Sequence, residues 1–288
     1  MMITSETKIF ALMGDPVKGS LSPAIHNSAF RAMGMNSVYV AFRVPRAHLA
    51  DAIAGIRALG ITGLNVTHPH KIAIMNFLDE LDESAKSVMA VNTVKKERGK
   101  LTGFNTDGMG AVKALEKEVG ALKGKRVVVL GAGGAARAIA FALLKKGAEL
   151  TIANRTLSNA IELKRLIEKK LGKTVDIIGI KRKELKNALS GAHVLINATT
   201  VGMSPNVDQT LVTADMMHRG LIVNDIVYKP LRTRLLREAK KAGAKPITGI
   251  GMLVHQAALA IKIWTNREPP VEVMMRAAER ELRRGENY

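Results

Sequence analysis

The chain has 288 residues, of which 47% are hydrophobic and 3% aromatic, and its formal net charge is +19 at pH 7. It contains no cysteine, which excludes disulfides, thiolate nucleophiles and cysteine-bound zinc. The basic residues fall in dispersed clusters late in helical patterns, and no nucleic-acid motif accompanies them, so we expect a solvated charged surface and no nucleic-acid partner. The first residues lack the basic and apolar regions of a signal peptide, and Arg137 interrupts the longest apolar stretch. We therefore expect a cytoplasmic protein without a membrane segment.

Strand-like and helix-like segments alternate through the first part of the chain, which is typical of βα units. Strands are expected at 8–14, 37–44 and 61–67, and helices at 22–34, 47–60 and 70–81. Residues 90–108 have a basic, glycine-containing centre between two apolar runs, which predicts a β-hairpin or a loop. A longer helix should follow at 109–120.

A second alternating series begins after this helix and predicts a parallel sheet. Its strands are expected at 126–134, 149–155, 175–180, 193–199 and 220–228, and its helices before Lys146 and at 158–172, 182–191 and 232–244. The helix at 252–264 is apolar on nearly every face, so it should be buried on all sides and lie between domains. Because 288 residues exceed the usual size of one domain, we predict two α/β domains with a boundary near residue 108.

The motif GxGxxA stands at Gly131, Gly133 and Ala136, between an apolar strand and an apolar helix. In this context the first glycine permits a tight turn, the second lets a diphosphate approach, and the helix N-terminus binds it. A glycine turn without a ligand is the alternative.

The strand after this motif ends in Asn154, Arg155 and Thr156, where an NAD enzyme usually carries an acidic residue. A cation at this position favours NADP over NAD, unless Arg155 is only a surface residue. Asn197 and Thr199 stand at a second strand end in this half, where a ribose or nicotinamide would lie, although taken alone the segment is an ordinary asparagine-rich turn.

Two serines, Ser20 and Ser22, stand between the first strand and its helix. Their hydroxyls could both donate to one carboxylate beside the helix N-terminus. Ser22 precedes Pro23, however, so helix capping alone would also explain it.

Polar residues also follow other short apolar segments in the first half: Lys71, Asn92, Asn105 and Asp107. If they meet at one sheet edge, a lysine and an aspartate could together exchange a proton with a substrate hydroxyl. We expect Lys71 in the first turn of the helix at 70–81, opposing the helix dipole, and thus held by an anionic group or exposed. For Asp107 the alternative is helix capping.

Three further side chains are candidates for a ligand role. Gln256 lies one turn after Met252 on the apolar helix and either faces a ligand or bonds the backbone. His68 and His70 flank Pro69 without a third metal ligand, so they are interpreted as plain loop residues and no metal site is predicted.

Over nearly its full length the chain resembles the shikimate dehydrogenase family. The resemblance rests on motifs that occur in this order: SLSPAIHN, NVTHPHK, AVNTV, FNTDG, GAGGAARA, NRT, NAT with GM, DIVYKP and GMLVHQAA. It implies the reversible NADP-dependent oxidation of shikimate to 3-dehydroshikimate in a cleft between two domains. Residues 1–108 with 252–288 would form the substrate-binding domain, and 109–251 a Rossmann-like NADP-binding domain with a doubly wound parallel sheet.

The resemblance also implies roles for individual residues. Lys71 and Asp107 would form the catalytic pair, and Asn65 is better interpreted as structural. Substrate would be bound by Ser20 and Ser22 at its carboxylate, by Tyr228 from the cofactor domain, and by Thr67, Asn92 and Gln256. The cofactor would be bound by Gly131, Ala132, Gly133, Gly134, Ala135, Asn154, Arg155, Thr156, Thr199, Gly251 and Met252.

Two positions depart from the family pattern. Gly19 stands where the family usually has histidine, which leaves the serine pair intact. Asn159 stands where a second basic residue often helps to hold the 2′-phosphate, which places more of the NADP preference on Arg155. The alternatives are a quinate/shikimate dehydrogenase that uses NAD, and a nucleotide-binding regulator without turnover. A monomer or a homodimer is expected.

Overall fold

The computed structural model describes residues 3–285, which divide into two compact α/β domains. The first domain contains the residues up to Gly110 and those from Val254 onward, and the second contains Ala111–Leu253. The chain passes from one domain to the other inside α4 (Asp107–Val119) and again inside α9 (Ile250–Thr265). The predicted α/β fold with two domains is confirmed.

The first domain is built on a six-stranded mixed sheet in the order β2-β1-β3-β5-β6-β4. Strand β1 pairs in parallel with β2 and β3, whereas β5 is antiparallel to both β3 and β6. The strands are β1 (Lys8–Gly14), β2 (Ser37–Arg43), β3 (Gly63–Val66), β4 (Glu80–Leu81), β5 (Thr93–Glu97) and β6 (Lys100–Phe104).

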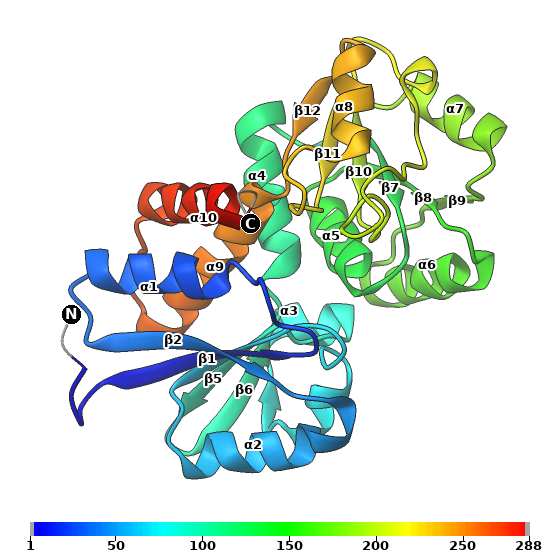
Figure 1. The fold of residues 1–288 in the computed structure, drawn as a ribbon. Helices are drawn as coiled ribbons and strands as arrows, with labels where there is room; N and C mark the ends of the chain where they lie inside the picture. Colours follow the sequence, from blue (N-terminus) through cyan, green and yellow to red (C-terminus); the bar gives the residue numbers. More distant parts are fainter. Residues whose placement is uncertain (1–2, 286–288) are drawn as a thin grey trace. The chain divides into compact units, whose positions relative to one another are not determined.

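Helices cover both faces of this sheet (Figure 1). One face carries α1 (Ser22–Ala32), α9 and α10 (Val271–Gly285), and the other carries α2 (Leu49–Ala58). The remaining helices of the domain are α3 (Glu83–Val88) and the 3₁₀ helices η1 (Arg46–His48) and η2 (Ala73–Phe77). Along β1, Phe10 contacts Phe30 and Trp264 on one face, while Ala11 and Met13 join the apolar cluster under α2. This alternation follows from the two-residue period of a strand.

The segment predicted as a hairpin is one, formed by β5 and β6. Its two-residue turn consists of Arg98 and Gly99, with φ of 49° and 81°. Positive φ at both positions is the mark of a type I′ turn, whose twist matches that of the flanking strands.

The prediction of a helix at 70–81 is wrong. Only the 3₁₀ helix Ala73–Phe77 forms, and Lys71 lies in the turn before it. The end of the segment joins the sheet instead: the Asp79 carboxylate accepts a 2.6 Å hydrogen bond from the Leu101 N–H, and β4 pairs with β6. Pairing with the neighbouring strand therefore overrides the helical pattern of the sequence.

The second domain has a sheet in the order β12-β11-β10-β7-β8-β9, with every pair parallel. This is the doubly wound order, in which the chain starts in the centre and builds outward in both directions. The strands are β7 (Arg126–Leu130), β8 (Glu149–Ala153), β9 (Asp176–Ile178), β10 (Val194–Asn197), β11 (Ile222–Asp225) and β12 (Lys245–Ile247). The order reverses between β7 and β10, so a ligand is expected at the carboxyl ends of these two strands.

Helices connect the strands of the second domain. They are α5 (Gly134–Lys145), α6 (Leu157–Leu171), α7 (Arg182–Ser190), η3 (Ala214–Met216) and α8 (Arg234–Lys241), after α4. Leucines of α7 and α8 pack with Val128, Leu195 and Val223 of the central strands in one buried cluster. In Figure 1, α5 and α6 lie on the opposite side of the sheet.

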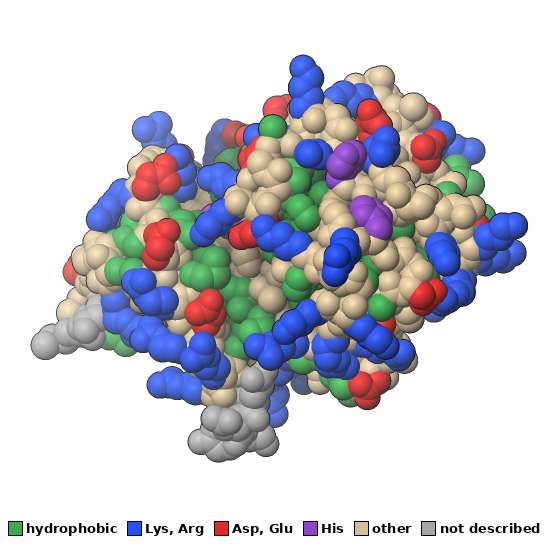
Figure 2. Space-filling model, turned by 90° about the horizontal axis from the view of Figure 1, so that it is seen from above, with side chains coloured by type: hydrophobic (Ala, Val, Ile, Leu, Met, Phe, Trp, Pro, Cys, Tyr) green, Lys and Arg blue, Asp and Glu red, His purple; other side chains and the backbone are tan. Residues whose placement is uncertain are grey.

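The predicted apolar helix corresponds to α9, of which Val254, Ala257, Ala260 and Ile261 are fully buried. Its expected place between the domains stays a prediction. On the face shown in Figure 2, Lys and Arg side chains are spread over the surface and do not gather in one place. Within residues 3–285, no helix is long and apolar enough to cross a membrane.

Candidate active site

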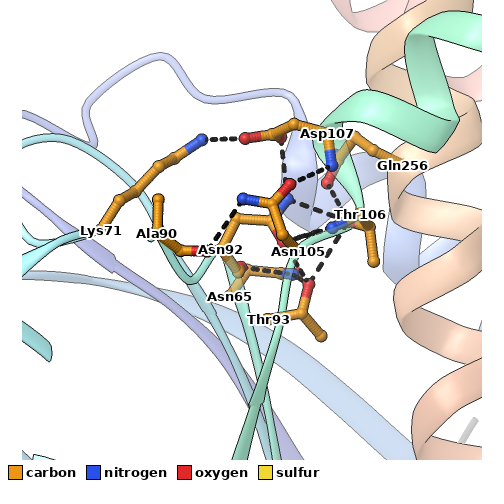
Figure 3. Close-up of polar contacts among 9 residues, drawn as sticks. All are labelled: Asn65, Lys71, Ala90, Asn92, Thr93, Asn105, Thr106, Asp107 and Gln256. Atoms are coloured by element: carbon orange, nitrogen blue, oxygen red, sulfur yellow. Dashed lines mark hydrogen bonds and ion pairs between the residues drawn. The ribbon is translucent and has the colours of Figure 1, made fainter. Parts of the chain in front are cut away.

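Lys71 and Asp107 meet at the carboxyl edge of the first domain's sheet (Figure 3). Lys71 follows β3 in a turn, and Asp107 opens α4 directly after β6. The Nζ of Lys71 lies 2.5 Å from Oδ2 of Asp107, with 25% of the lysine and 8% of the aspartate side chain exposed. Lys71 is thus held by an anionic group, which was one of the two outcomes expected for it.

The Asp107 carboxylate serves the site and does not cap α4. Its second oxygen, Oδ1, accepts a 2.8 Å hydrogen bond from Nδ2 of Asn92. The Asp107 N–H donates instead to Oδ1 of Asn105, whose Nδ2 donates to the Ala90 carbonyl. Asn105 therefore satisfies the start of the helix, and both Asp107 oxygens remain committed to Lys71 and Asn92.

Asn92, 3% exposed, uses its whole hydrogen-bonding capacity within the protein. Its Nδ2 donates to Asp107 and to the Thr106 hydroxyl, and its Oδ1 accepts from the Thr106 N–H and the Thr93 hydroxyl. An amide has two donors and two acceptor sites. A substrate hydroxyl bound by Asn92 would consequently replace one of these bonds.

A buried layer of polar side chains lies beneath this site. Asn65 donates to the Asn92 carbonyl at 3.2 Å and to the Thr93 hydroxyl at 3.0 Å, and it accepts a 2.8 Å bond from the Tyr39 phenol. Burial raises the pKa of Tyr39, and a hydrogen bond with Ser22 acts in the opposite direction. Tyr39, Thr93 and Thr106 were missed in the sequence because single hydroxyls inside strands and turns carry no periodic signal.

The serine pair stands at the start of α1. Leu21 is the N-cap residue and makes no side-chain capping bond, so Ser22 is not the cap but the first helical residue. The Ser20 hydroxyl accepts a 3.3 Å hydrogen bond from the Ser22 N–H. Ser22 is buried, and Ser20 is half-buried.

The other residues singled out in this domain have distinct surroundings. Thr67 is half-buried directly after β3, and the Oε1 of Gln256 lies 3.4 Å from the Thr106 hydroxyl. His68 is exposed, but His70 is buried and its Nε2 donates to the Val44 carbonyl at 2.7 Å. His70 is a loop residue, as interpreted, and this bond ties the loop that carries Lys71 to the end of β2.

The glycine turn of the second domain has the geometry of a diphosphate site. Gly131 has φ of +106°, a conformation that side chains rarely adopt, and it links β7 to α5. Gly133 is the N-cap of α5, and a Cβ on Gly133 or Gly134 would meet no atom within 4 Å. The first turn of α5 carries no acidic residue. The start of α5 therefore has open space beside Gly133 and Gly134 and no negative side chain, which fits the diphosphate of a dinucleotide.

The segment after β8 forms a turn around Arg155. The Nδ2 of Asn154 donates to the Thr156 carbonyl at 2.7 Å, and the Arg155 side chain between them is exposed. Asn159 is exposed in the first turn of α6. These residues fit a phosphorylated ribose, with Arg155 as the cation.

The remaining candidates of the second domain lie in other segments. Thr199 follows β10, and a Cβ on Gly131 would lie 3.0 Å from its Cγ2. Tyr228 is half-buried after β11, and burial raises the pKa of its phenol. Gly251 and Met252 lie in the first turn of α9. No cluster of three His, Cys, Asp or Glu side chains suited to a metal ion occurs in the part of the chain that the structure describes.

Three protein-family models match the chain. They describe a shikimate dehydrogenase substrate binding domain (residues 12–94), a shikimate / quinate 5-dehydrogenase (residues 113–227) and a shikimate 5′-dehydrogenase C-terminal domain (residues 249–279). The chain is 52% identical to the shikimate dehydrogenase (NADP(+)) of Methanopyrus kandleri over 284 residues, which is 98% of each chain.

Solved structures agree with the sequence comparisons. A crystal structure of shikimate dehydrogenase in complex with NADP+ matches with a TM-score of 0.93 at 49% identity, over 98% of both chains. The shikimate 5-dehydrogenase of Thermus thermophilus, in complex with NADP(H) and shikimate, matches with a TM-score of 0.86 at 38% identity, over 96% of this chain and 100% of that chain.

Proposed function

Since the chain belongs to the shikimate dehydrogenase family, we propose that it catalyses the NADP-dependent interconversion of shikimate and 3-dehydroshikimate. The observation that carries this proposal is the pair formed by Lys71 and Asp107, joined at 2.5 Å and both largely shielded from water. A pair at the carboxyl edge of the sheet lies where α/β proteins bind ligands.

The pair supplies the proton transfer that the reaction requires. In the oxidative direction Lys71 Nζ receives the proton of the reacting hydroxyl, and in the reductive direction it returns a proton to the carbonyl oxygen. Asp107 Oδ2, 2.5 Å from Nζ, lies beside the amine that exchanges this proton and holds it in place. General acid–base catalysis of this kind contributes about 10² to 10⁴ in rate.

Asn92 orients the aspartate during this transfer. Its Nδ2 occupies Oδ1 of Asp107, which leaves Oδ2 directed to the amine. Thr106 holds the Asn92 amide from both sides, donating its N–H to Oδ1 and accepting from Nδ2. We propose that Thr67, Asn92 and Gln256 bind the substrate hydroxyls and that Ser20, Ser22 and Tyr228 bind its carboxylate.

In the second domain, the start of α5 would hold the diphosphate of NADP and Arg155 would hold its 2′-phosphate. The chemistry that NADP would supply there is a hydride acceptor for the carbinol carbon. We propose that Gly131, Ala132, Gly133, Gly134 and Ala135 contact the cofactor at this turn, and that Asn154, Thr156 and Thr199 contribute further contacts. Gly251 and Met252 are proposed to contact the cofactor from the start of α9.

The test is a steady-state assay of the purified protein that follows NADPH absorbance. We expect turnover with shikimate and NADP+, and a loss of turnover in Lys71→Ala and Asp107→Asn while NADP+ binding persists. A wild-type protein that binds NADP+ without reducing it would instead be the nucleotide-binding regulator.

The second candidate is a quinate/shikimate dehydrogenase that prefers NAD. It is favoured by Asn159, which stands exposed beside the proposed phosphate site and carries no charge. Kinetics with both acids and both cofactors separates the candidates, because a higher kcat/KM with quinate and NAD would select the second. A cytoplasmic location, a monomeric or homodimeric state and the absence of a nucleic-acid partner stay predictions.

A further inference from the structure

Asp225, at the end of β11, is a fully buried carboxylate outside the residues assigned so far. It accepts three hydrogen bonds. Oδ1 accepts from Nδ2 of Asn197 at 2.9 Å and from the Val227 N–H at 3.0 Å, and Oδ2 accepts from the Thr233 hydroxyl at 2.6 Å. Burial raises the pKa of Asp225, and the three bonds oppose that effect. A buried acid with so many partners is retained only where its geometry is needed or compensated.

Asn197, at the end of the neighbouring strand β10, links this carboxylate to the segment that follows β10. Its Nδ2 also donates to the Val201 carbonyl at 3.2 Å. Its Oδ1 accepts from both the N–H and the hydroxyl of Thr199, at 3.1 and 2.7 Å. A rotation of the Asn197 amide would break these bonds, so Asp225 and the Val201 carbonyl together hold the amide in the orientation that Thr199 requires.

Thr199 in turn packs against the glycine turn. A Cβ on Gly131 would lie 3.0 Å from Thr199 Cγ2 and 3.2 Å from the Ala198 carbonyl oxygen. The Ala198 N–H also donates to the Leu130 carbonyl at 3.0 Å. The segment after β10 and the turn after β7 are therefore in direct contact at the reversal point of the sheet.

We propose that Asp225 is a positioning residue for the dinucleotide: through Asn197 it sets Thr199 against Gly131 and so keeps the glycine turn in the form that receives the diphosphate. The inference rests on the proposed function, since it assumes that NADP binds at this turn. It assigns Asp225 no contact with the cofactor. The hydrogen bond that Asp225 accepts from the Val227 N–H shapes the start of the segment that leads to Tyr228.

A carboxylate suits this position better than an amide. All three partners are donors, whereas an asparagine offers one oxygen and two N–H groups. The Thr233 hydroxyl already accepts from the Leu236 N–H at the start of α8, so its proton must go to an acceptor. Asp225→Asn keeps the shape of the side chain and removes one acceptor.

The experiment measures the Kd for NADP+ by isothermal titration calorimetry, first on the wild-type protein. We expect Asp225→Asn to raise the Kd about tenfold, the effect of losing a charged hydrogen-bond partner. Asn197→Ala should raise it similarly, and the double variant should add little more, because both act through one chain of contacts. In turnover, KM for NADP+ should rise while kcat stays near the wild-type value.

Asp215→Asn is the matched control. Asp215 also accepts a hydrogen bond from a threonine, Thr213, in the same domain, but it is exposed. The Kd of the Asp215→Asn variant for NADP+ should equal that of the wild-type protein. Should Asp225→Asn not fold, Thr233→Val removes a single donor to Asp225 and should still raise the Kd about threefold.

The inference is overturned if Asp225→Asn folds and binds NADP+ with the wild-type Kd. If Asp225→Asn does not fold, an unchanged Kd for NADP+ in Thr233→Val overturns it. Additive effects in the double variant also overturn it. A wild-type protein that binds no NADP+ overturns both this inference and the proposed function. Wild-type binding of NADP+ without turnover counts against the proposed function alone.

Discussion

The imidazole of His26 lies flat against the ring of Tyr39, with the ring centroids 4.1 Å apart and 2° between the planes. His26 is fully buried, and neither of its ring nitrogens has a hydrogen-bond partner. Phe30 and Trp264 complete an aromatic layer around it. Burial lowers the pKa of His26 to about 3, so the ring is neutral in the folded protein near neutral pH.

This relationship predicts a dependence of stability on pH. Below about pH 6.5 the unfolded chain binds a proton at His26 and the folded protein does not, so acidification favours unfolding. The residue's contribution is complete above the unfolded pKa and is lost as the pH falls toward about 3, by at most about 1.4 kcal/mol per pH unit. Urea unfolding between about pH 4 and 7 measures this slope.

The matched variants for this prediction are His26→Phe and His48→Gln. His26→Phe cannot titrate and should show a flatter dependence of unfolding free energy on pH. His48 is exposed, so its replacement should leave the slope unchanged. Equal slopes in the wild type and His26→Phe would contradict the prediction.

Removal of the proposed proton carrier should abolish most turnover. Lys71→Ala is expected to lower kcat by about 10² to 10⁴, the usual contribution of acid–base catalysis. Lys100→Ala is the control, because it breaks an exposed pair with Glu80 at 2.8 Å in the same domain. The measurement is kcat at saturating shikimate, and near wild-type turnover in Lys71→Ala would remove this lysine from the mechanism.

Asn65 should act on stability more than on chemistry. Asn65→Ala removes the acceptor of the Tyr39 phenol and the donor to the Thr93 hydroxyl and the Asn92 carbonyl, all in a buried layer, and it should lower the unfolding free energy by about 2 kcal/mol or more. Asn36→Ala breaks exposed hydrogen bonds and should change it by less than about 0.5 kcal/mol. Urea unfolding compares the two variants, and similar losses would refute a structural role for Asn65.

The preference for NADP should depend on Arg155. Arg155→Ala removes the exposed cation beside the start of α6 and is expected to raise KM for NADP+ about 10- to 100-fold, the range for a lost charged hydrogen bond. KM for NAD+ should stay the same, since NAD+ lacks the 2′-phosphate. Arg165→Ala is the control, because Arg165 is likewise an exposed cation but lies further along, within α6. An equal rise for both cofactors would place Arg155 outside the phosphate site.

Gly131 should tolerate no side chain when the cofactor binds. Gly131→Ala strains a residue with φ of +106° and brings its Cβ to 3.0 Å from Thr199, so the Kd for NADP+ should rise at least tenfold. Gly60→Ala, at φ of +69° with no atom within 4 Å, has the strain without the contact. Calorimetric titration distinguishes them, and equal Kd values would show that the contact is unimportant.

Much of the fold could be predicted because the information is local. The two-residue and 3.6-residue periods of apolar side chains located most strands and helices, and the glycine motif located the turn after β7. The helix predicted at 70–81 failed because its last residues pair with β6, a strand that lies later in the chain. A pattern within one segment carries no information about such a partner.

The sequence by itself determined which residue types stand at the ends of the strands, and thus that amine, carboxylate and amide groups were available at the edges of two sheets. Only the tertiary structure decided which of them meet. Lys71 and Asp107 are 36 positions apart, and Asn197 and Asp225 are 28 apart. Strand order and register bring each pair within hydrogen-bonding distance, and these depend on the packing of the whole domain.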